Sequence, residues 1–147
     1  MKVLVTGGAG FIGSALVRYI IDNTDNTVLN VDKLTYAGSL ISIDSVSDSS
    51  RYNFEHADIT DRKALRGIFE RYQPQLVIHL AAESHVDRSI DAPEDFIQTN
   101  IIGTYSLLEE SRRFWSTLPC GEQNLFRFHH VSTDEVYGDL GFNGQLF

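Results

Sequence analysis

The sequence predicts an α/β fold, a doubly wound parallel sheet with helices on both of its faces. Short uninterrupted apolar runs alternate along the chain with longer segments whose apolar residues recur at helical spacing. A glycine-rich turn also follows the first apolar run directly and opens the first helical segment. Such alternation implies right-handed β-α-β crossovers, and hence a sheet whose strands run parallel. We expect the strand order 3-2-1-4-5, with the glycine turn at the carboxyl edge.

The first half of the sequence contains strands that read as continuous apolar runs, which is typical of strands buried on both faces. Two such strands are predicted, at residues 3–5 and 28–32, and residues 51–58 are a third strand candidate. Between the first two, apolar residues follow helical spacing from Phe11 to Ile20, with Arg18 and Asp22 on the other side. The stretch 34–50 is rich in Ser and Asp and is predicted as a loop with a short helix. A second amphipathic helix is expected over residues 62–72.

The second half continues the alternation. Pro74 ends the preceding helix, and an apolar run predicts a strand at 76–80. Pro93, with acidic residues directly behind it, suits the first turn of a helix extending to about residue 113. A fifth strand is predicted at 125–131, and the glycine-containing stretch 138–147 is predicted as a loop.

Length and composition favour one globular domain. The chain has 147 residues, 42% of them apolar, and a formal charge of −8. This charge argues against nucleic acid and anionic membranes as partners, and no apolar run reaches the length of a membrane span. A lone cysteine, Cys120, and five histidines without metal-ligand spacing predict neither a disulfide nor a metal site. We expect a cytoplasmic protein.

The glycine turn predicts a dinucleotide site. The residues from Thr6 to Gly13 read TGGAGFIG, which satisfies G-x-G-x-x-G and also G-x-x-G-x-x-G. Glycines allow the tight turn and the approach of a pyrophosphate to the backbone, where the helix N-terminus favours an anion. Asp32 ends the second predicted strand, roughly 20 residues further on, where a carboxylate can accept both ribose hydroxyls of NAD. The chain is therefore predicted to be a Rossmann domain.

The charge of Asp32 favours NAD over NADP, because a carboxylate would repel the 2′-phosphate of NADP. Lys33, the next residue, tempers this preference. An incidental glycine-rich turn is the structural alternative. The order strand, turn, helix, strand and acidic residue argues against it.

Three further strings resemble a known family. They are DKLTYAG at 32–38, AAESHVDRS at 81–89 and STDEVYG at 132–138. With the glycine turn, they resemble the dTDP-glucose 4,6-dehydratases, which are NAD-dependent members of the extended short-chain dehydrogenases. The resemblance extends from residue 1 to about residue 140. It implies a lyase that dehydrates dTDP-glucose to dTDP-4-keto-6-deoxyglucose in deoxysugar biosynthesis, acting as a homodimer.

The resemblance also implies roles for individual residues. Phe11 and Ile12 would lie at the pyrophosphate beside Gly7, Gly10 and Gly13. Asp32, Lys33, Leu34 and Thr35 would surround the adenosine ribose, while Asp58 and Ile59 would border the adenine. Leu80, Ala81, Ala82, Glu83 and Ser84 would follow the cofactor toward the nicotinamide, with Thr99 also near it. Ser84 and Thr133 would face the sugar.

Asp134 and Glu135 directly follow the fifth predicted strand, at the edge where parallel sheets bind ligands. Alone, the pair would suit a solvated loop or a helix cap. The resemblance implies that Glu135 removes the proton on carbon 5, Asp134 protonates the departing hydroxyl on carbon 6 and Thr133 bonds the oxygen on carbon 4. Related 4-epimerases and decarboxylases share the fold, and they remain alternatives that lack this acid pair.

The Y-x-x-x-K of the family does not occur in these 147 residues, because no tyrosine has a lysine four positions later. We therefore expect residues 1–147 to be an incomplete NAD-binding domain, truncated before the Tyr-Lys helix and the C-terminal substrate domain. Two hypotheses remain. The chain is either part of a longer lyase or a non-catalytic NAD-binding fragment, and the acid pair favours the first.

Overall fold

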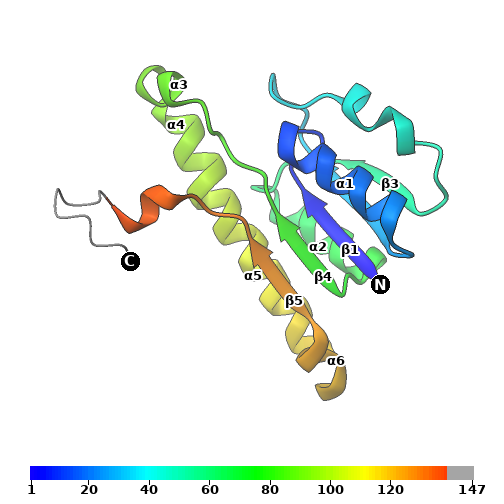
Figure 1. Cartoon of the computed structure of the whole chain (residues 1–147). Helices are drawn as coiled ribbons and strands as arrows, with labels where there is room; N and C mark the ends of the chain where they lie inside the picture. The colour runs from blue at the N-terminus through cyan, green and yellow to red at the C-terminus, as the bar shows by residue number, and fades with distance from the viewer. Residues whose placement is uncertain (139–147) are drawn as a thin grey trace, which may run out of the picture.

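The computed structural model describes residues 1–138, with side chains except those of residues 86–88 and 135. Its centre is a five-stranded sheet in the order β3-β2-β1-β4-β5 (Figure 1). The strands are β1 (Lys2–Thr6), β2 (Thr27–Asp32), β3 (Tyr52–His56), β4 (Leu76–His79) and β5 (Arg127–His130). Every pairing is parallel. The predicted fold class and strand order are confirmed, whereas the predicted loop beyond residue 138 lies outside the described residues.

Two layers of helices cover the sheet. Helix α1 (Phe11–Asn23) and the 3-10 helix η1 (Leu40–Val46) pack on one face, and α2 (Arg62–Tyr72) and α5 (Thr104–Thr117) pack on the other. Along β1, Val3 and Val5 belong to the first core and Leu4 to the second. Because successive strand residues point to opposite faces, a strand covered on both sides must be apolar throughout. This explains the uninterrupted runs in the sequence.

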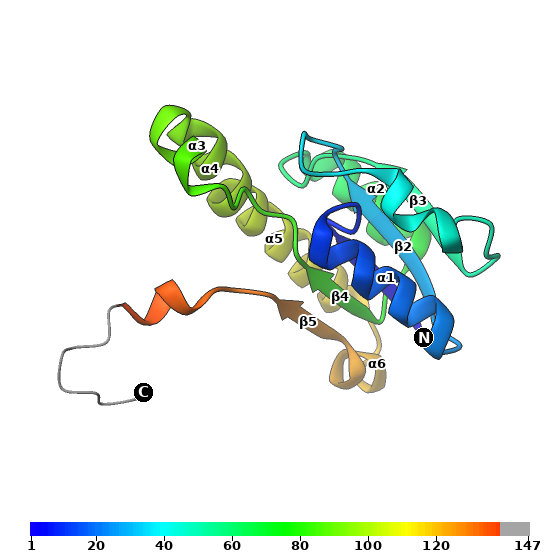
Figure 2. The same ribbon diagram turned by 45° about the horizontal axis from the view of Figure 1, so that its top comes forward.

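The predicted helix over residues 93–113 is divided in the structure. It comprises α4 (Pro93–Phe96), a π-helical segment η2 (Ile97–Gly103) and α5, which form one long rod in both views (Figures 1 and 2). A β-carbon on Gly103 would lie 2.6 Å from Cδ1 of Ile59. Glycine thus lets the rod approach the loop after β3. π-Helical turns are rare and often occur at functional sites, and the apolar pattern did not reveal this one.

Other boundaries also differ from the sequence prediction. Helix α3 (Val86–Asp91), which the sequence analysis did not predict, follows the loop after β4. The fifth strand was predicted from residue 125, but Leu125 ends a further helix, α6 (Cys120–Leu125). The third strand ends at His56, so Asp58 lies in the following loop. After β5 the chain runs away from the sheet into the 3-10 helix η3 (Asp134–Tyr137) (Figure 2). No helix among the described residues is long and apolar enough to cross a membrane.

Candidate functional site

The glycine turn connects β1 to α1 at the carboxyl edge of the sheet. Gly7 has a φ of 74°, in the left-handed region that favours glycine, and its N–H donates to the carbonyl of Val31 at 3.0 Å. A β-carbon on Gly13 would lie 2.1 Å from the carbonyl oxygen of Gly7. The turn therefore requires glycine at both positions. It directs the first N–H groups of α1, which have no partners within the helix, toward the space above the sheet.

Asp32, at the end of β2, faces this turn. Its Oδ2 accepts the N–H of Ala9 at 2.9 Å, and its Oδ1 accepts the N–H of Leu34 at 2.8 Å. Leu34 has a φ of 53°, an uncommon conformation for leucine that this second bond helps to hold. The two backbone bonds fix the orientation of the carboxylate. Each of its oxygens keeps further accepting capacity for a ligand hydroxyl.

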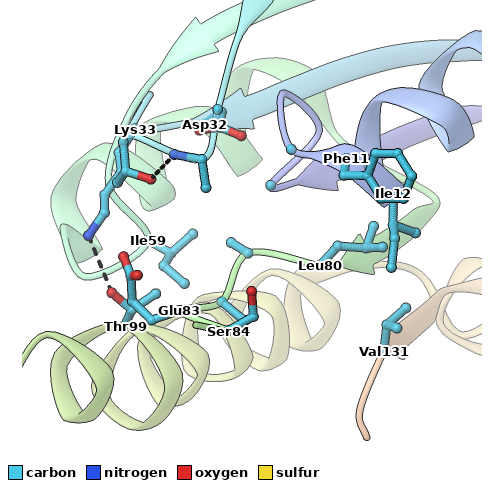
Figure 3. Close-up of a pocket in the computed structure, with 18 of the residues that line it drawn as sticks. Phe11, Ile12, Asp32, Lys33, Ile59, Leu80, Glu83, Ser84, Thr99 and Val131 are labelled. Atoms are coloured by element: carbon cyan, nitrogen blue, oxygen red, sulfur yellow. Dashed lines mark hydrogen bonds between the residues drawn. The ribbon is translucent and has the colours of Figure 1, made fainter. Parts of the chain in front are cut away.

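Lys33 bridges two other elements near Asp32. Its Nζ lies 3.5 Å from Oδ2 of Asp58 and donates to Oγ1 of Thr99 at 3.3 Å. Burial raises the pKa of Asp58, but hydrogen bonds from Thr60 and the Lys33 ammonium outweigh it and hold the pKa below its ordinary value. Asp58 is thus a carboxylate at neutral pH. Thr99 lies at the Lys33 end of the site, away from Val131 (Figure 3).

These elements line a cleft of about 570 Å³. Figure 3 shows Lys33, Ile59 and Thr99 together at one end and Ile12 and Val131 at the other. Most of the site residues expected from the sequence line the cleft: Gly7, Gly10, Phe11, Ile12, Gly13, Asp32, Lys33, Thr35, Ile59, Leu80, Ala81, Ala82, Glu83, Ser84, Thr99 and Thr133. The structure therefore brings together residues from widely separated segments of the chain.

Three expected residues whose side chains are described, Leu34, Asp58 and Asp134, do not line this cleft. Leu34 packs against the apolar core beside α1. Asp58 is linked to the cleft through its ion pair with Lys33, which lines the cleft. Asp134 is exposed in η3, directly after Thr133, which does line the cleft. Glu135 belongs to the same turn, and its side chain lies outside the described part of the structure.

Sequence reasoning missed several lining residues, namely Val31, Tyr36, Ala37, Gly38, Ala57, His85, Val131 and Ser132. Tyr36, Ala37, Gly38, His85 and Ser132 stand within the three family strings, which were the available signal. It also missed Asn100. The N–H of Glu83 donates to Oδ1 of Asn100 at 2.8 Å, and Nδ2 of Asn100 donates to the carbonyl of Glu83 at 2.9 Å.

His79, the last residue of β4, links the sheet to the helical rod beside the cleft. Its Nδ1 lies 2.7 Å from the hydroxyl of Thr6 in β1, and its Nε2 lies 2.9 Å from the hydroxyl of Thr104 in α5. Burial, with a smaller contribution from His130, lowers the pKa of His79 to about 4. The imidazole is therefore neutral near pH 7, and it ties the strand before the glycine turn to the helical rod. Among the described residues, no cluster of His, Cys, Asp and Glu could hold a metal ion.

Comparison with known proteins agrees with this geometry. The sequence family described as GDP-mannose 4,6 dehydratase matches residues 4–145. The chain belongs to this family. A curated relative, dTDP-glucose 4,6-dehydratase from Salmonella typhimurium, is 66% identical over 140 residues, covering 95% of this chain and 39% of the relative. The chain thus spans about two fifths of that relative's length.

Solved structures of dTDP-glucose 4,6-dehydratases show the same fold. The enzyme from Bacillus anthracis, in complex with NAD, is 36% identical with a TM-score of 0.81, over 100% of this chain and 42% of that one. The Streptomyces venezuelae enzyme, with NAD and TYD bound, is 39% identical with a TM-score of 0.82, over 99% and 43%. This family member therefore has the Rossmann-type sheet of these dehydratases.

Proposed function

We propose that this chain provides the NAD-binding part of a dTDP-glucose 4,6-dehydratase. The observation that carries the proposal is the cleft in which the N-terminus of α1 and the fixed carboxylate of Asp32 open toward the same space. Such a site combines a helix N-terminus that binds an anion with a carboxylate that accepts hydrogen bonds from a diol. A dinucleotide presents both groups, in its pyrophosphate and its ribose. The relatives named as dTDP-glucose 4,6-dehydratases, and those solved with NAD, support the assignment.

The residues of the cleft suit the parts of NAD in order. The first N–H groups of α1, beside Phe11 and Ile12, would bind the pyrophosphate, and Asp32 would accept the adenosine ribose hydroxyls. Ile59 offers an apolar wall to the adenine. Leu80 to Ser84 would lead toward the nicotinamide. When bound, NAD supplies the hydride acceptor and donor, while the chain binds and orients the reactants.

We propose that Thr133, Asp134 and Glu135 act on the sugar. Thr133 would hydrogen-bond the oxygen on carbon 4, Asp134 would protonate the departing hydroxyl on carbon 6, and Glu135 would remove the proton on carbon 5. The lining position of Thr133 and the exposure of Asp134 in the next turn support this arrangement. A dehydration needs one acid and one base, and adjacent carboxyl groups supply both when their surroundings differ. The sugar would also contact Ser84.

A chimera tests the catalytic proposal. Residues 1–140 of this chain would replace the matching segment of the Salmonella typhimurium relative, which is 66% identical to this chain over 140 residues. We expect this chimera to convert dTDP-glucose to the 4-keto-6-deoxy product. Asp134→Asn or Glu135→Gln should let reduced cofactor accumulate without product, because oxidation and water loss use different groups. Glu94→Gln, a change at an exposed acid of α4, is the matched control. Normal dehydration in either acid variant would contradict the assignment.

The same data favour a second proposal for the chain by itself. These 147 residues contain no Y-x-x-x-K, so we infer that the isolated chain binds NAD without turning over dTDP-glucose. Product formation by the isolated chain, at a rate above that of the Asp134→Asn variant, would contradict this inference.

We also propose that the longer protein is a cytoplasmic homodimer. Along the helical rod, Ile97, Ile101, Tyr105 and Leu108 are exposed at intervals of one helical turn. An apolar stripe of this kind on a soluble protein indicates a contact surface. The net charge of −8 makes nucleic acid an unfavourable partner. Sedimentation of the chimera tests the dimer, and Ile101→Glu should shift it toward monomer while the exposed control Gln98→Glu should not.

A further inference from the structure

Three side chains join the loops that follow β2 and β4. The hydroxyl of Tyr36 lies 3.0 Å from Oε2 of Glu83 and 3.2 Å from Nδ1 of His85. The rings of Tyr36 and His85 also meet edge to face, with centroids 5.3 Å apart. All three residues line the cleft. We call this group, Tyr36 with Glu83 and His85, the Tyr36 clasp.

The clasp has a defined direction of proton donation. Tyr36 carries one hydroxyl proton, which it donates to the carboxylate of Glu83. The contact with His85 can then be a hydrogen bond only if Nδ1 of the imidazole carries a proton and donates to the tyrosine oxygen. The three groups thus form a chain from imidazole through hydroxyl to carboxylate. Removal of the hydroxyl breaks both links together.

The two loops joined by the clasp are each anchored at their base, whereas the clasp itself is exposed. Asn100 fixes the backbone of Glu83 with two hydrogen bonds, so this side has a rigid base. The Tyr36 loop begins at Leu34, with its left-handed φ of 53°, and the N–H of Ser39 donates to the carbonyl of Ala9 at 2.9 Å. Tyr36 is 49% exposed. Hydrogen bonds at such exposed positions are easily exchanged for water, so the clasp can open without disturbing the core.

The position of the clasp relates it to the path of a bound dinucleotide. In the sheet, β1 lies between β2 and β4, so a link between the loops after β2 and β4 crosses the end of β1. The glycine turn lies at that same end. Resting on the function proposed above, we propose that the Tyr36 clasp is a gate that opens and closes over NAD as it enters and leaves the cleft.

A gate and a direct ligand contact differ in their kinetics. Opening a gate raises the association and dissociation rates together, whereas loss of a contact raises mainly the dissociation rate. We expect Tyr36→Phe in this chain to raise both rates by roughly 2- to 10-fold, with little change in Kd, because the two exposed links together contribute about as much net free energy as one ordinary hydrogen bond. NADH fluorescence in stopped flow gives association, and displacement by excess NAD gives dissociation. Tyr19→Phe, at an exposed tyrosine of α1, is the matched control.

Two further measurements distinguish a gate from a direct contact between Tyr36 and the dinucleotide. If the hydroxyl acts through Glu83, the effects of Tyr36→Phe and Glu83→Gln on the rates will not add. Without any NAD, Tyr36→Phe should also speed amide hydrogen exchange in residues 33–38 and 81–85. Unchanged rates, a rise in dissociation alone, additive effects or unchanged exchange would each overturn the gate. Failure of the unaltered chain to bind NADH would instead refute the proposed NAD site and the gate that depends on it, even if exchange showed the loops to be joined.

Discussion

Asn100 and Glu83 exchange two hydrogen bonds, at 2.8 and 2.9 Å, so the amide of one side chain satisfies both backbone groups of the other residue. Asn100 lies in the π-helical segment, and Glu83 lies in the loop after β4. The pair ties the cleft wall to the helical rod. It acts in place of the sheet ladder, which ends at His79.

We predict that Asn100→Ala weakens NAD binding and lowers the free energy of unfolding by about 1–3 kcal/mol, because two half-buried backbone groups lose their partners. Asn100→Asp keeps the acceptor and loses the donor, so its stability and NAD affinity should lie between those of the unaltered chain and those of Asn100→Ala. Thermal unfolding of the chain with and without NAD measures both effects. Gln98→Ala, at an exposed position of the same segment, is the control. An Asn100→Ala protein with unchanged stability would show that the loop does not depend on this pair.

We predict that Asp32→Asn weakens NAD binding more than NADP binding. Each charge-assisted bond to a ribose hydroxyl contributes about 1.5–3 kcal/mol, and the carboxylate also repels the 2′-phosphate of NADP. Calorimetric titration of the chain with each dinucleotide gives the ratio of the two affinities. Asp25→Asn, an exposed acid beyond α1, should leave that ratio unchanged. Equal losses for both dinucleotides would refute the ribose role.

The fold and the part of the cleft around the glycine turn and Asp32 could be predicted from the sequence, because these depend on local patterns. Buried parallel strands need continuous apolar residues, and the turn between β1 and α1 needs glycine at Gly7 and Gly13. The strand end at Asp32 follows from the same pattern. Each of these signals lies within a few residues of the feature that it predicts.

The rest of the site depends on contacts between distant segments. The Tyr36 clasp joins residues 47 and 49 positions apart, and Asn100 reaches Glu83 across 17 positions. The π-helical turn that contains Asn100 could not be recognised from the spacing of apolar residues in the sequence. The predicted fifth strand was too long because Leu125 is an exposed residue that ends α6, and because the apolar Phe126 packs against Phe114 of α5.

We predict that His79 makes the chain less stable in mild acid. The folded-state pKa of about 4 lies below the ordinary value of 6.5. Between these two pH values the His79 imidazole is therefore protonated in the unfolded chain but neutral in the folded chain. Stability is therefore full above about pH 6.5 and falls as the pH drops toward 4, by about 3 kcal/mol at most. His79→Gln should flatten this slope in urea unfolding measured from pH 7 to 4. His129→Gln, at an exposed strand residue, should retain it.

We predict that Glu110→Gln loosens the contact between α2 and α5. The Glu110 side chain is fully buried, and its carboxylate lies 3.0 Å from Arg62 and 3.1 Å from Arg66. The Arg66 hydrogen bond, opposed by burial and helped by Arg62, lowers the pKa of Glu110, so its contribution is present above the ordinary glutamate pKa and is lost as the pH falls further. We expect a loss of about 1–3 kcal/mol at pH 7, since both arginines remain partly hydrated. Glu109→Gln, at the neighbouring surface pair, should cost much less. Equal losses would contradict the prediction.

We predict that the chain of 147 residues self-associates. Strand β5 forms one edge of the sheet, and beside it an apolar groove of about 340 Å³ is lined by Ile12, Leu16, Leu76, Ile78, Leu80, His129 and Val131. An uncovered strand edge next to an apolar surface recruits other chains. Sedimentation should show concentration-dependent oligomers. Val131→Lys places a charge in the groove and should shift the chain toward monomer, whereas Val136→Lys, at an exposed valine of η3 outside the groove, should not. A stable monomer that binds NAD tightly would contradict the prediction that other chains bind to this groove.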